Sequence, residues 1–227
     1  MSIRSEGGQG TAFVYGSGTQ TCFVTAAHVL AGAREGGFIL MRRYGEWKSF
    51  PLTMVSVHPD GQDLALFAVS GLVLDIEHAF IHPNDPKLYP GQELKFTGFP
   101  HGLENLIDSP MGFSTPLVRT AFLSGTIILP DKGGALLVLD GLNNPGYSGG
   151  PVWAPGPTLE QPTLLGVISG YRVELKSKSR VYKDLGEKRE AEIPDLFVKP
   201  NSGMIHAVPY AELVKLAAKN TVFNSHQ

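Results

Sequence analysis

One serine lies in a segment that is built for a sharp turn. In the stretch NNPGYSGGPVW, residues 143–153, Ser148 stands between Gly146 and the pair Gly149 and Gly150. Glycine carries no Cβ, so it is favoured where a backbone bends sharply or approaches another molecule closely. The hydroxyl of Ser148 is therefore a candidate nucleophile.

A serine nucleophile needs two further groups. Its hydroxyl reacts poorly at neutral pH, so a base must take its proton and a third group must orient that base. His28 follows the apolar stretch TCFVTAA, which predicts an imidazole at the end of a strand. Asp63 begins the apolar run DLALFAV, where a buried carboxylate needs a donor such as an imidazole N–H. These residue types predict nucleophilic catalysis by a serine.

Other residues of the same types fit these roles less well. Asp60 is an alternative to Asp63, but the sequence PDG puts it inside a turn, where Asp commonly binds its own backbone. The remaining histidines do not stand in a comparable context; they are His58, His78, His82, His101, His206 and His226.

The composition predicts a β-rich protein. The 227 residues include 27 Gly, 17 Pro and 18% charged residues, which is typical of many turns between short apolar segments. This length is enough for one large domain or two smaller lobes. A net charge of -2 and a pI near 6.4 give no electrostatic reason to bind nucleic acid or an anionic membrane, so we expect neither partner.

Cysteine usage and the N-terminus indicate the compartment. The single cysteine, Cys22, cannot form an intrachain disulfide, which suits a reducing environment. The first residues lack the apolar core of a secretion signal, and no apolar run approaches the roughly 18 residues of a membrane span. No set of His, Cys or carboxylate residues has the spacing of metal ligands. We therefore expect a soluble, cytoplasmic protein without metal or cofactor.

Short apolar runs separated by turn residues recur along the chain. Roughly six predicted strands precede an irregular, linker-like stretch at 101–116, and about six more follow it. Two such sets predict two β-barrels rather than one sheet, with lobes at 1–105 and 106–227. The sequence PYAELVKLAAKN, residues 209–220, is the one expected helix.

Residues 174–202 differ from the rest of the chain because charges of both signs are interleaved there. The segment is predicted to be a solvated insertion in the C-terminal lobe. Two interpretations remain open, a surface loop and a lid or regulatory element over a neighbouring site.

Three motifs in order, TAAHVL, DLAL and NNPGYSGGP, resemble the trypsin-like (chymotrypsin-fold) serine proteases, especially the disulfide-free bacterial branch that includes the HtrA-type enzymes. LLGVISG is similar to the substrate-pairing strand of that family, and GMIHAVP with the helix after it is similar to the family's ending. The resemblance extends over nearly the whole chain. It implies an all-β fold of two six-stranded antiparallel barrels with a C-terminal α-helix, and a serine endopeptidase that acts through an acyl-enzyme.

The resemblance also implies roles for single residues. His28 would be the general base, Asp63 would orient it, and Ser148 would be the nucleophile, with the first two in the N-terminal lobe and the serine in the C-terminal lobe. The backbone N–H groups of Gly146 and Ser148 would form an oxyanion hole, which stabilises the developing negative charge.

The substrate site implied by the resemblance is apolar. Ser169, Gly170 and Tyr171 would pair with an extended protein or peptide substrate as an added strand. Leu142, six residues before the serine, would lie at the floor of the pocket for the P1 side chain, so no acid awaits Arg or Lys. Glutamate-cutting relatives have a histidine where this chain has Ile168. Small or medium apolar P1 residues are therefore expected.

The sequence departs from the secreted members of the family at Tyr147. Those proteases have an acid there, which pairs with a newly cut N-terminus, so that route of activation is not expected here. We expect the enzyme to fold in a competent state, or to be switched by the 174–202 insertion or by a regulatory protein partner.

Two other classes of protein compete with this interpretation. The sequence GYSGG also matches the nucleophile elbow of α/β-hydrolases, and Asp184 or Asp195 followed by His206 gives their order of triad residues. That fold needs a helix directly after the serine, and the prolines that follow Ser148 oppose one. The other alternative is a catalytically silent, protease-fold binding module.

Overall fold

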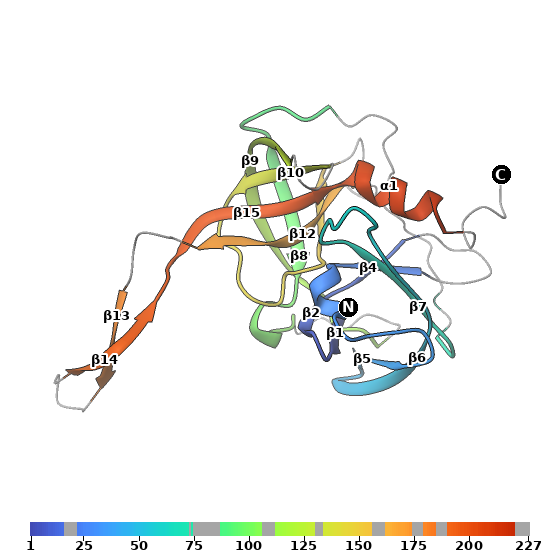
Figure 1. Ribbon diagram of the computed structural model, residues 1–227, viewed down its shortest axis with the longest axis horizontal. Helices are drawn as coiled ribbons and strands as arrows, with labels where there is room; N and C mark the ends of the chain where they lie inside the picture. Colours follow the sequence, from blue (N-terminus) through green and yellow to red (C-terminus); the bar gives the residue numbers. More distant parts are fainter. Residues whose placement is uncertain are drawn as a thin grey trace.

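The structure is a computed structural model of the chain, and it describes residues 1–15, 22–72, 74, 87–105, 112–129, 134–155, 162–173, 179–184 and 190–220. Two antiparallel β-sheet bodies lie against each other, with a helix beside them and a two-stranded ribbon that projects from the second body (Figure 1). The expected all-β fold of two barrels is confirmed.

The first body is a seven-stranded sheet in the order β2-β1-β5-β6-β7-β4-β3. It has one strand more than expected, because Ser2–Ser5 and Gly8–Thr11 pair as an additional hairpin while one of the six expected strands, Glu93–Gly98, belongs to the second body. The sequence GSGTQ, residues 16–20, at which turn-forming residues between two apolar runs predict a hairpin, lies outside the described residues. The strands are β1 Ser2–Ser5, β2 Gly8–Thr11, β3 Phe13–Val14, β4 Cys22–Thr25, β5 Phe38–Arg43, β6 Glu46–Val57 and β7 Ala65–Val69.

The core of the first body is built mainly from apolar strand residues. β7, with the sequence ALFAV, is buried at every position because it lies between β6 and β4 inside the sheet. Phe67 of β7 stacks on Phe23 of β4 with ring centroids 5.1 Å apart. These strands are therefore a rigid support for the residues at their ends.

The second body is a closed six-stranded barrel in the order β10-β15-β12-β11-β8-β9. Within this ring β11 pairs with β12 from Thr163 to Val167, so Ser169–Tyr171 of β12 lie beyond the part that pairs with β11. Its strands are β8 Glu93–Gly98, β9 Leu117–Leu129, β10 Gly134–Asp140, β11 Pro151–Ala154, β12 Thr163–Val173 and β15 Asn201–Pro209.

The position of β8 corrects the predicted lobe boundary. We placed this strand in the lobe 1–105, but it pairs with β9 and β11 in the second barrel. The irregular stretch after it therefore connects two strands of one barrel and does not link the lobes. The pattern of apolar residues identified β8 as a strand, but it carried no information on the strands with which β8 pairs.

The C-terminal helix α1, Tyr210–Ala218, lies where the sequence predicted a helix. Leu213, Leu216 and Ala217 are buried in one cluster with Val24 of β4 and Leu66 of β7. The helix follows β15 of the second barrel and packs against both bodies, on β12 and β15 of the second and on β7 of the first. Each fully buried leucine contributes about 1.5–3 kcal/mol to stability, so α1 holds the two bodies together.

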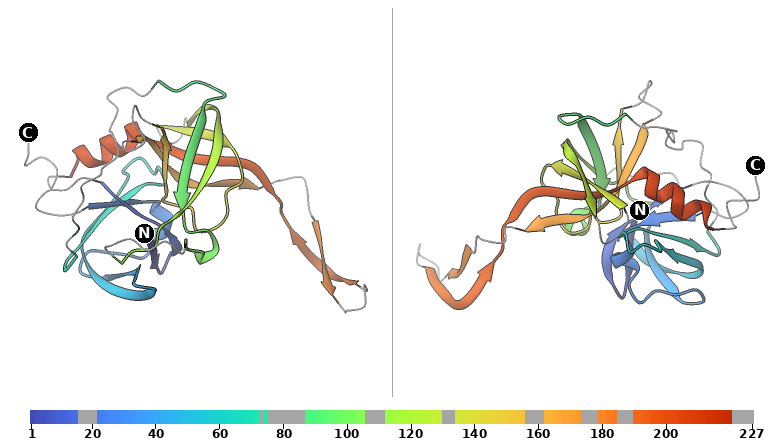
Figure 2. Two further views of the ribbon diagram at one scale, coloured as in Figure 1. Left: turned by 180° about the vertical axis from the view of Figure 1, so that it is seen from behind. Right: turned by 45° about the horizontal axis from the view of Figure 1, so that its top comes forward.

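In the part that the structure describes, the charged insertion forms a pair of strands. β13, Ser179–Asp184, and β14, Glu190–Val198, form an antiparallel ribbon that projects from the ends of β12 and β15 (Figures 1 and 2). We call it the arm. The sequence analysis weighed the charged residues of this segment and did not recognise its strand-forming residues, such as Tyr182 and Val198, which are 50% and 55% exposed.

Candidate active site

His28 lies at the end of a buried strand. All four residues of β4 are buried, and a short 3-10 helix, Ala27–Leu30, follows the strand. The side chain of His28 is 50% exposed, so the imidazole is anchored at its base and accessible at its tip. This is the placement at a strand end that the sequence predicted.

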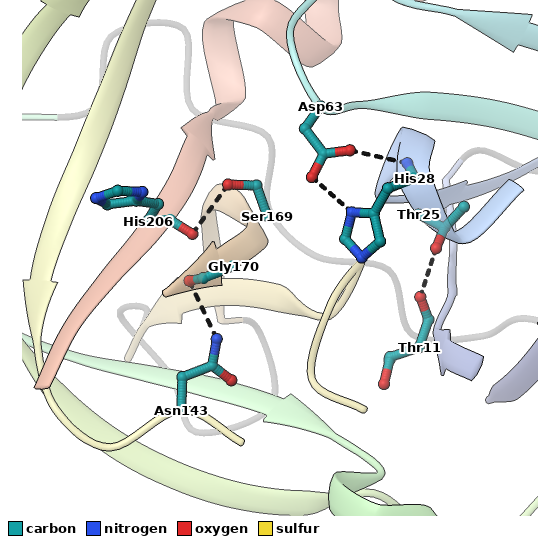
Figure 3. A network of polar contacts seen from close by, with 8 residues as sticks. All are labelled: Thr11, Thr25, His28, Asp63, Asn143, Ser169, Gly170 and His206. Carbon is teal, nitrogen blue, oxygen red and sulfur yellow. Dashed lines mark hydrogen bonds and ion pairs between the residues drawn. The ribbon is translucent and has the colours of Figure 1, made fainter. Parts of the chain in front are cut away.

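Asp63 reaches His28 with both carboxylate oxygens. Oδ1 accepts a hydrogen bond of 2.9 Å from the backbone N–H of His28, and Oδ2 lies 2.8 Å from Nδ1 (Figure 3). An ionised carboxylate can only accept, so Nδ1 carries the proton and Nε2 of a neutral imidazole is left as a base. The hydrogen bond to Asp63 is the main cause of a raised pKa at His28.

Asp60 has a different environment. Its backbone N–H lies 3.3 Å from Nδ1 of His58, within the turn that leads to Asp63. Asp63 lies two residues before the start of β7, and the loop is closed by a 3.0 Å hydrogen bond from the N–H of His58 to the carbonyl of Leu64. The structure therefore brings Asp63 to His28, as the sequence analysis preferred.

The segment with Ser148 belongs to the second barrel but is hydrogen bonded to the first. The carbonyl of Ser148 accepts a 2.8 Å bond from the backbone N–H of Thr11, and the carbonyl of Gly146 accepts a 2.7 Å bond from the hydroxyl of Thr11. The N–H of Gly149 donates to the carbonyl of Ile168, 2.7 Å away on β12. The serine turn is thus fixed on both sides.

Two glycines of this turn have backbone angles that other residues rarely adopt. Gly146 has φ +107° and Gly149 has φ +85°. A Cβ on Gly149 would collide with the carbonyl oxygen of Thr11 and the hydroxyl of Thr25, and one on Gly146 with the carbonyl oxygen of Phe99. The close contact with the first body therefore requires glycine at position 149, and the close contact with Phe99 inside the second barrel requires glycine at position 146.

Two backbone donors next to the serine are unused. The N–H groups of Gly146 and Ser148 donate to no acceptor in the part of the chain that the structure describes. The hydroxyl of Ser148 likewise makes no hydrogen bond with His28 or with any other described residue. Neighbouring free N–H groups of this kind can bind an oxyanion.

Thr11 and Asn143 were not found by the sequence analysis. Asn143 is 1% exposed, and its Nδ2 donates to the carbonyl of Gly170, 3.1 Å away (Figure 3). The backbone carbonyl of Asn143 accepts a 2.6 Å bond from the side-chain amide of Asn201. It therefore connects the serine segment to the strand expected to bind substrate. Thr11 belongs to none of the three motifs, and Asn143 begins the motif NNPGYSGGP without a role of its own there. The importance of both residues comes from contacts with residues distant in sequence.

The comparisons with known proteins identify the family. The model of the trypsin-like peptidase domain matches residues 10–156, which is more than half of the chain and includes His28, Asp63 and Ser148. The chain belongs to the trypsin-like peptidase family. It is a serine endopeptidase by this membership, and the resemblance to trypsin-like and HtrA-type protease domains is confirmed. No curated protein matches the chain significantly.

Solved structures of trypsin-like fold resemble the chain over most of its length. An inactive form of Rv3671c from Mycobacterium tuberculosis aligns with a TM-score of 0.59, 20% identity and coverage of 100% of this chain and 87% of the other. The active form of the same protease aligns with a TM-score of 0.57 and 21% identity, over 93% of this chain and 73% of the other. Deg5 aligns with a TM-score of 0.55 and 21% identity, over 94% of this chain and 84% of the other. At these identities the likeness shows the fold.

Tyr147 occupies the place of the acid in secreted trypsin-like peptidases. Its side chain is fully buried in the second barrel, in an edge-to-face contact with Phe96 at 4.9 Å. Burial is the main cause of its raised pKa, so the phenol remains neutral. An aromatic ring that packs in the core offers no charge with which an N-terminal ammonium could pair.

The expected pocket residues of this trypsin-like peptidase differ in burial. Ile168 is fully buried in the barrel core, and Ser169 donates a 3.3 Å hydrogen bond to the carbonyl of His206. Leu142 is 51% exposed, and its carbonyl accepts a bond from Arg119. Its place at a pocket floor remains a prediction.

The structure contradicts the α/β-hydrolase alternative. Ser148 is followed by strand β11 and not by a helix, and Asp195 lies on the projecting arm.

Among the described residues, no cluster of three or more His, Cys, Asp or Glu side chains could hold a metal ion. Within the same residues, no helix is long and apolar enough to span a membrane.

Proposed function

We propose that this peptidase cleaves peptide bonds with Ser148 as nucleophile, His28 as general base and Asp63 as the group that orients His28. The 2.8 Å contact between Nδ1 of His28 and Oδ2 of Asp63 is the observation that carries the proposal. It leaves Nε2 as the proton acceptor, and the hydrogen bonds from Thr11 hold the serine segment against the lobe that contains His28.

The reaction follows from these groups. Nε2 of His28 takes the hydroxyl proton of Ser148 while Oγ attacks the carbonyl carbon of the scissile bond. The carbonyl oxygen becomes an oxyanion that accepts hydrogen bonds from the N–H groups of Gly146 and Ser148. The imidazolium then gives its proton to the leaving amine, and an acyl-enzyme remains. A water molecule, deprotonated by the same imidazole, hydrolyses the ester and restores the serine.

The contact between Ser148 and His28 is expected to form with substrate. Catalytic hydrogen bonds are often long or poorly aligned in a free enzyme and tighten when the substrate binds. The His28 side chain is half exposed, so it can adjust without disturbing the core.

We also propose that the substrate is an extended polypeptide that pairs with Ser169, Gly170 and Tyr171 on β12. Small or medium apolar P1 side chains fit a pocket whose expected lining has Leu142 and Tyr171 and no acid. A cleavage profile on a peptide library tests both points. Preference for Ala, Val or Leu at P1 is expected, and a profile dominated by Arg, Lys or Glu would contradict the assignment of the pocket.

A reducing compartment such as the cytoplasm suits this chain, as we propose from Cys22. Its thiol is buried, and burial raises its pKa to about 11, so it has little tendency to react. We propose the arm as the surface at which a regulatory protein partner would bind, because several of its apolar side chains are exposed.

A further inference from the structure

A buried pair of ionisable residues joins the helix of the second half to the loop that carries Asp63. Nε2 of His58 lies 3.3 Å from Oε2 of Glu212 on α1. Both residues are buried, at 3% and 5% exposure. The mechanism proposed above uses neither side chain.

The surroundings of the pair define how it interacts. Nδ1 of His58 accepts from the backbone N–H of Asp60, so in the neutral ring the proton is on Nε2, which faces Glu212. Nε2 and the carboxylate are not aligned for a directed hydrogen bond, and the contact is therefore electrostatic. The other oxygen of Glu212 accepts a 2.8 Å bond from Lys215, whose side chain reaches solvent.

The position of His58 is coupled to that of Asp63 by the backbone. The N–H of His58 donates to Leu64, and the carbonyl of His58 accepts a 3.2 Å bond from the N–H of Gly61. Asp63 lies inside this closed loop, between the buried residues Gln62 and Leu64. A shift of His58 would therefore move the carboxylate that orients His28.

Besides contributing Glu212 to the ion pair, the helix packs on Leu64, the residue at which the Asp63 loop closes. Leu64 belongs to the same buried cluster as Leu213 and Leu216 of α1. Glu212 is on the first turn of this helix, close to the end of β15. The contact thus fixes the loop from the lobe that contains the serine.

We propose that Glu212 is a positioning residue, which holds the Asp63 loop through His58 in the place where Asp63 can bind His28. Glu212 is not expected to contact substrate or any reacting atom, and its effect reaches His28 through His58 and Asp63. The proposal rests on the proposed function for its consequence in catalysis, but the placement of Asp63 can be measured without catalysis.

Kinetics test the consequence. Displacement of a catalytic group by about 1 Å can lower the rate roughly 100-fold, so we expect kcat of Glu212→Ala to fall by about 10- to 100-fold with little change in KM. Glu212→Gln keeps the shape of the side chain and should lose less. Glu104→Gln is the control, because Glu104 also forms a partly buried ion pair, with Arg42 of β5, and is not part of this loop. Its kcat should equal that of the wild type.

A proton NMR titration of His28 tests the placement directly. The bond to Asp63 raises the pKa of His28, so its loss in Glu212→Ala or Glu212→Gln should lower that pKa toward 6.5. The acidic limb of kcat/KM should move to lower pH by the same amount. The proposal is overturned if both variants fold and the His28 pKa stays at its wild-type value, even if the melting temperature falls.

The outcomes separate this inference from the proposed function. If the wild type hydrolyses nothing but the His28 pKa drops in the Glu212 variants, positioning stands and the proposed reaction fails. If the wild type is active and the Glu212 variants keep both rate and His28 pKa, the positioning role is lost and the reaction stands. Should Glu212→Ala not fold, Glu212→Gln and His58→Phe provide the same measurement.

Discussion

The backbone N–H of Thr11 donates a 2.8 Å hydrogen bond to the carbonyl oxygen of Ser148, so a strand of the first barrel holds the serine of the second. The hydroxyl of Thr11 adds a bond to Gly146 and accepts one from the N–H of Phe99. One small, buried residue thereby connects the serine turn to the lobe that contains His28 and Asp63.

Replacement of Thr11 by valine should therefore damage both stability and turnover. The substitution leaves the carbonyl of Gly146 and the N–H of Phe99 without partners in a buried site, which costs about 1–3 kcal/mol for each group. Urea denaturation and kcat measure the two effects. Thr11→Ser keeps the hydroxyl and is the matched control. Equal stability and rate in Thr11→Val and the wild type would show that these bonds do not hold the turn.

Asp63→Asn should change the titration of His28 as well as the rate. Without the negative carboxylate the pKa of His28 falls toward its ordinary 6.5, because the hydrogen bond that raises it is weakened. The general base must be neutral, so activity increases with pH through this pKa and the acidic limb moves to lower pH. In related triads, loss of the orienting carboxylate costs about ten-thousand-fold in kcat. Asp60→Asn should leave both the limb and the rate unchanged, and an equal effect of the two substitutions would reverse the assignment.

Gly149→Ala should disrupt the serine turn. Its φ of +85° disfavours any other residue, and a Cβ would meet the Thr11 carbonyl and the Thr25 hydroxyl. We expect a loss of several kcal/mol in the free energy of unfolding or an insoluble protein. Gly125→Ala is the control, because a Cβ there has open space. Wild-type stability and activity of Gly149→Ala would mean that the turn has another conformation.

The arm offers a separate test of regulation. Strands β13 and β14 pair with each other, so removal of residues 179–198 with a short glycine linker should leave the barrels folded. The residues expected to bind substrate, Ser169–Tyr171, lie on β12, and the arm projects from the end of that strand. Turnover of long protein substrates should therefore fall at least about twofold, while short peptides are cut at the wild-type rate. Thermal melting and turnover of both substrates check this. Unchanged folding and unchanged turnover of long substrates would end the idea that the insertion is regulatory.

The sequence predicted well whatever depends on neighbouring residues. Apolar runs and turn residues identified the strands and the helix, and His28 and Asp63 were each placed at a strand end because a buried run adjoins them. The glycines around Ser148 predicted a constrained turn, and the structure shows why that turn excludes side chains.

Long-range contacts could not be predicted in this way. The partners of β8, the bonds from Thr11 to the serine turn and the pairing of His58 with Glu212 all join segments far apart in the chain. No local pattern encodes them, because they result from how separate strands pair within a barrel and how the two lobes pack on each other. The arm was missed for a different reason, since its charged residues dominated a pattern of strand-forming side chains.

Labelling by a fluorophosphonate, with the modified residue identified by mass spectrometry, tests the central claim most directly. A serine that is activated by His28 and flanked by free N–H groups reacts with such a probe, and an ordinary serine does not. We expect one adduct, on Ser148, at a rate that increases with pH through the pKa of His28 and is lost in Ser148→Ala and His28→Ala. Absence of an adduct above the Ser148→Ala background would contradict the account and favour a protease-fold module that only binds.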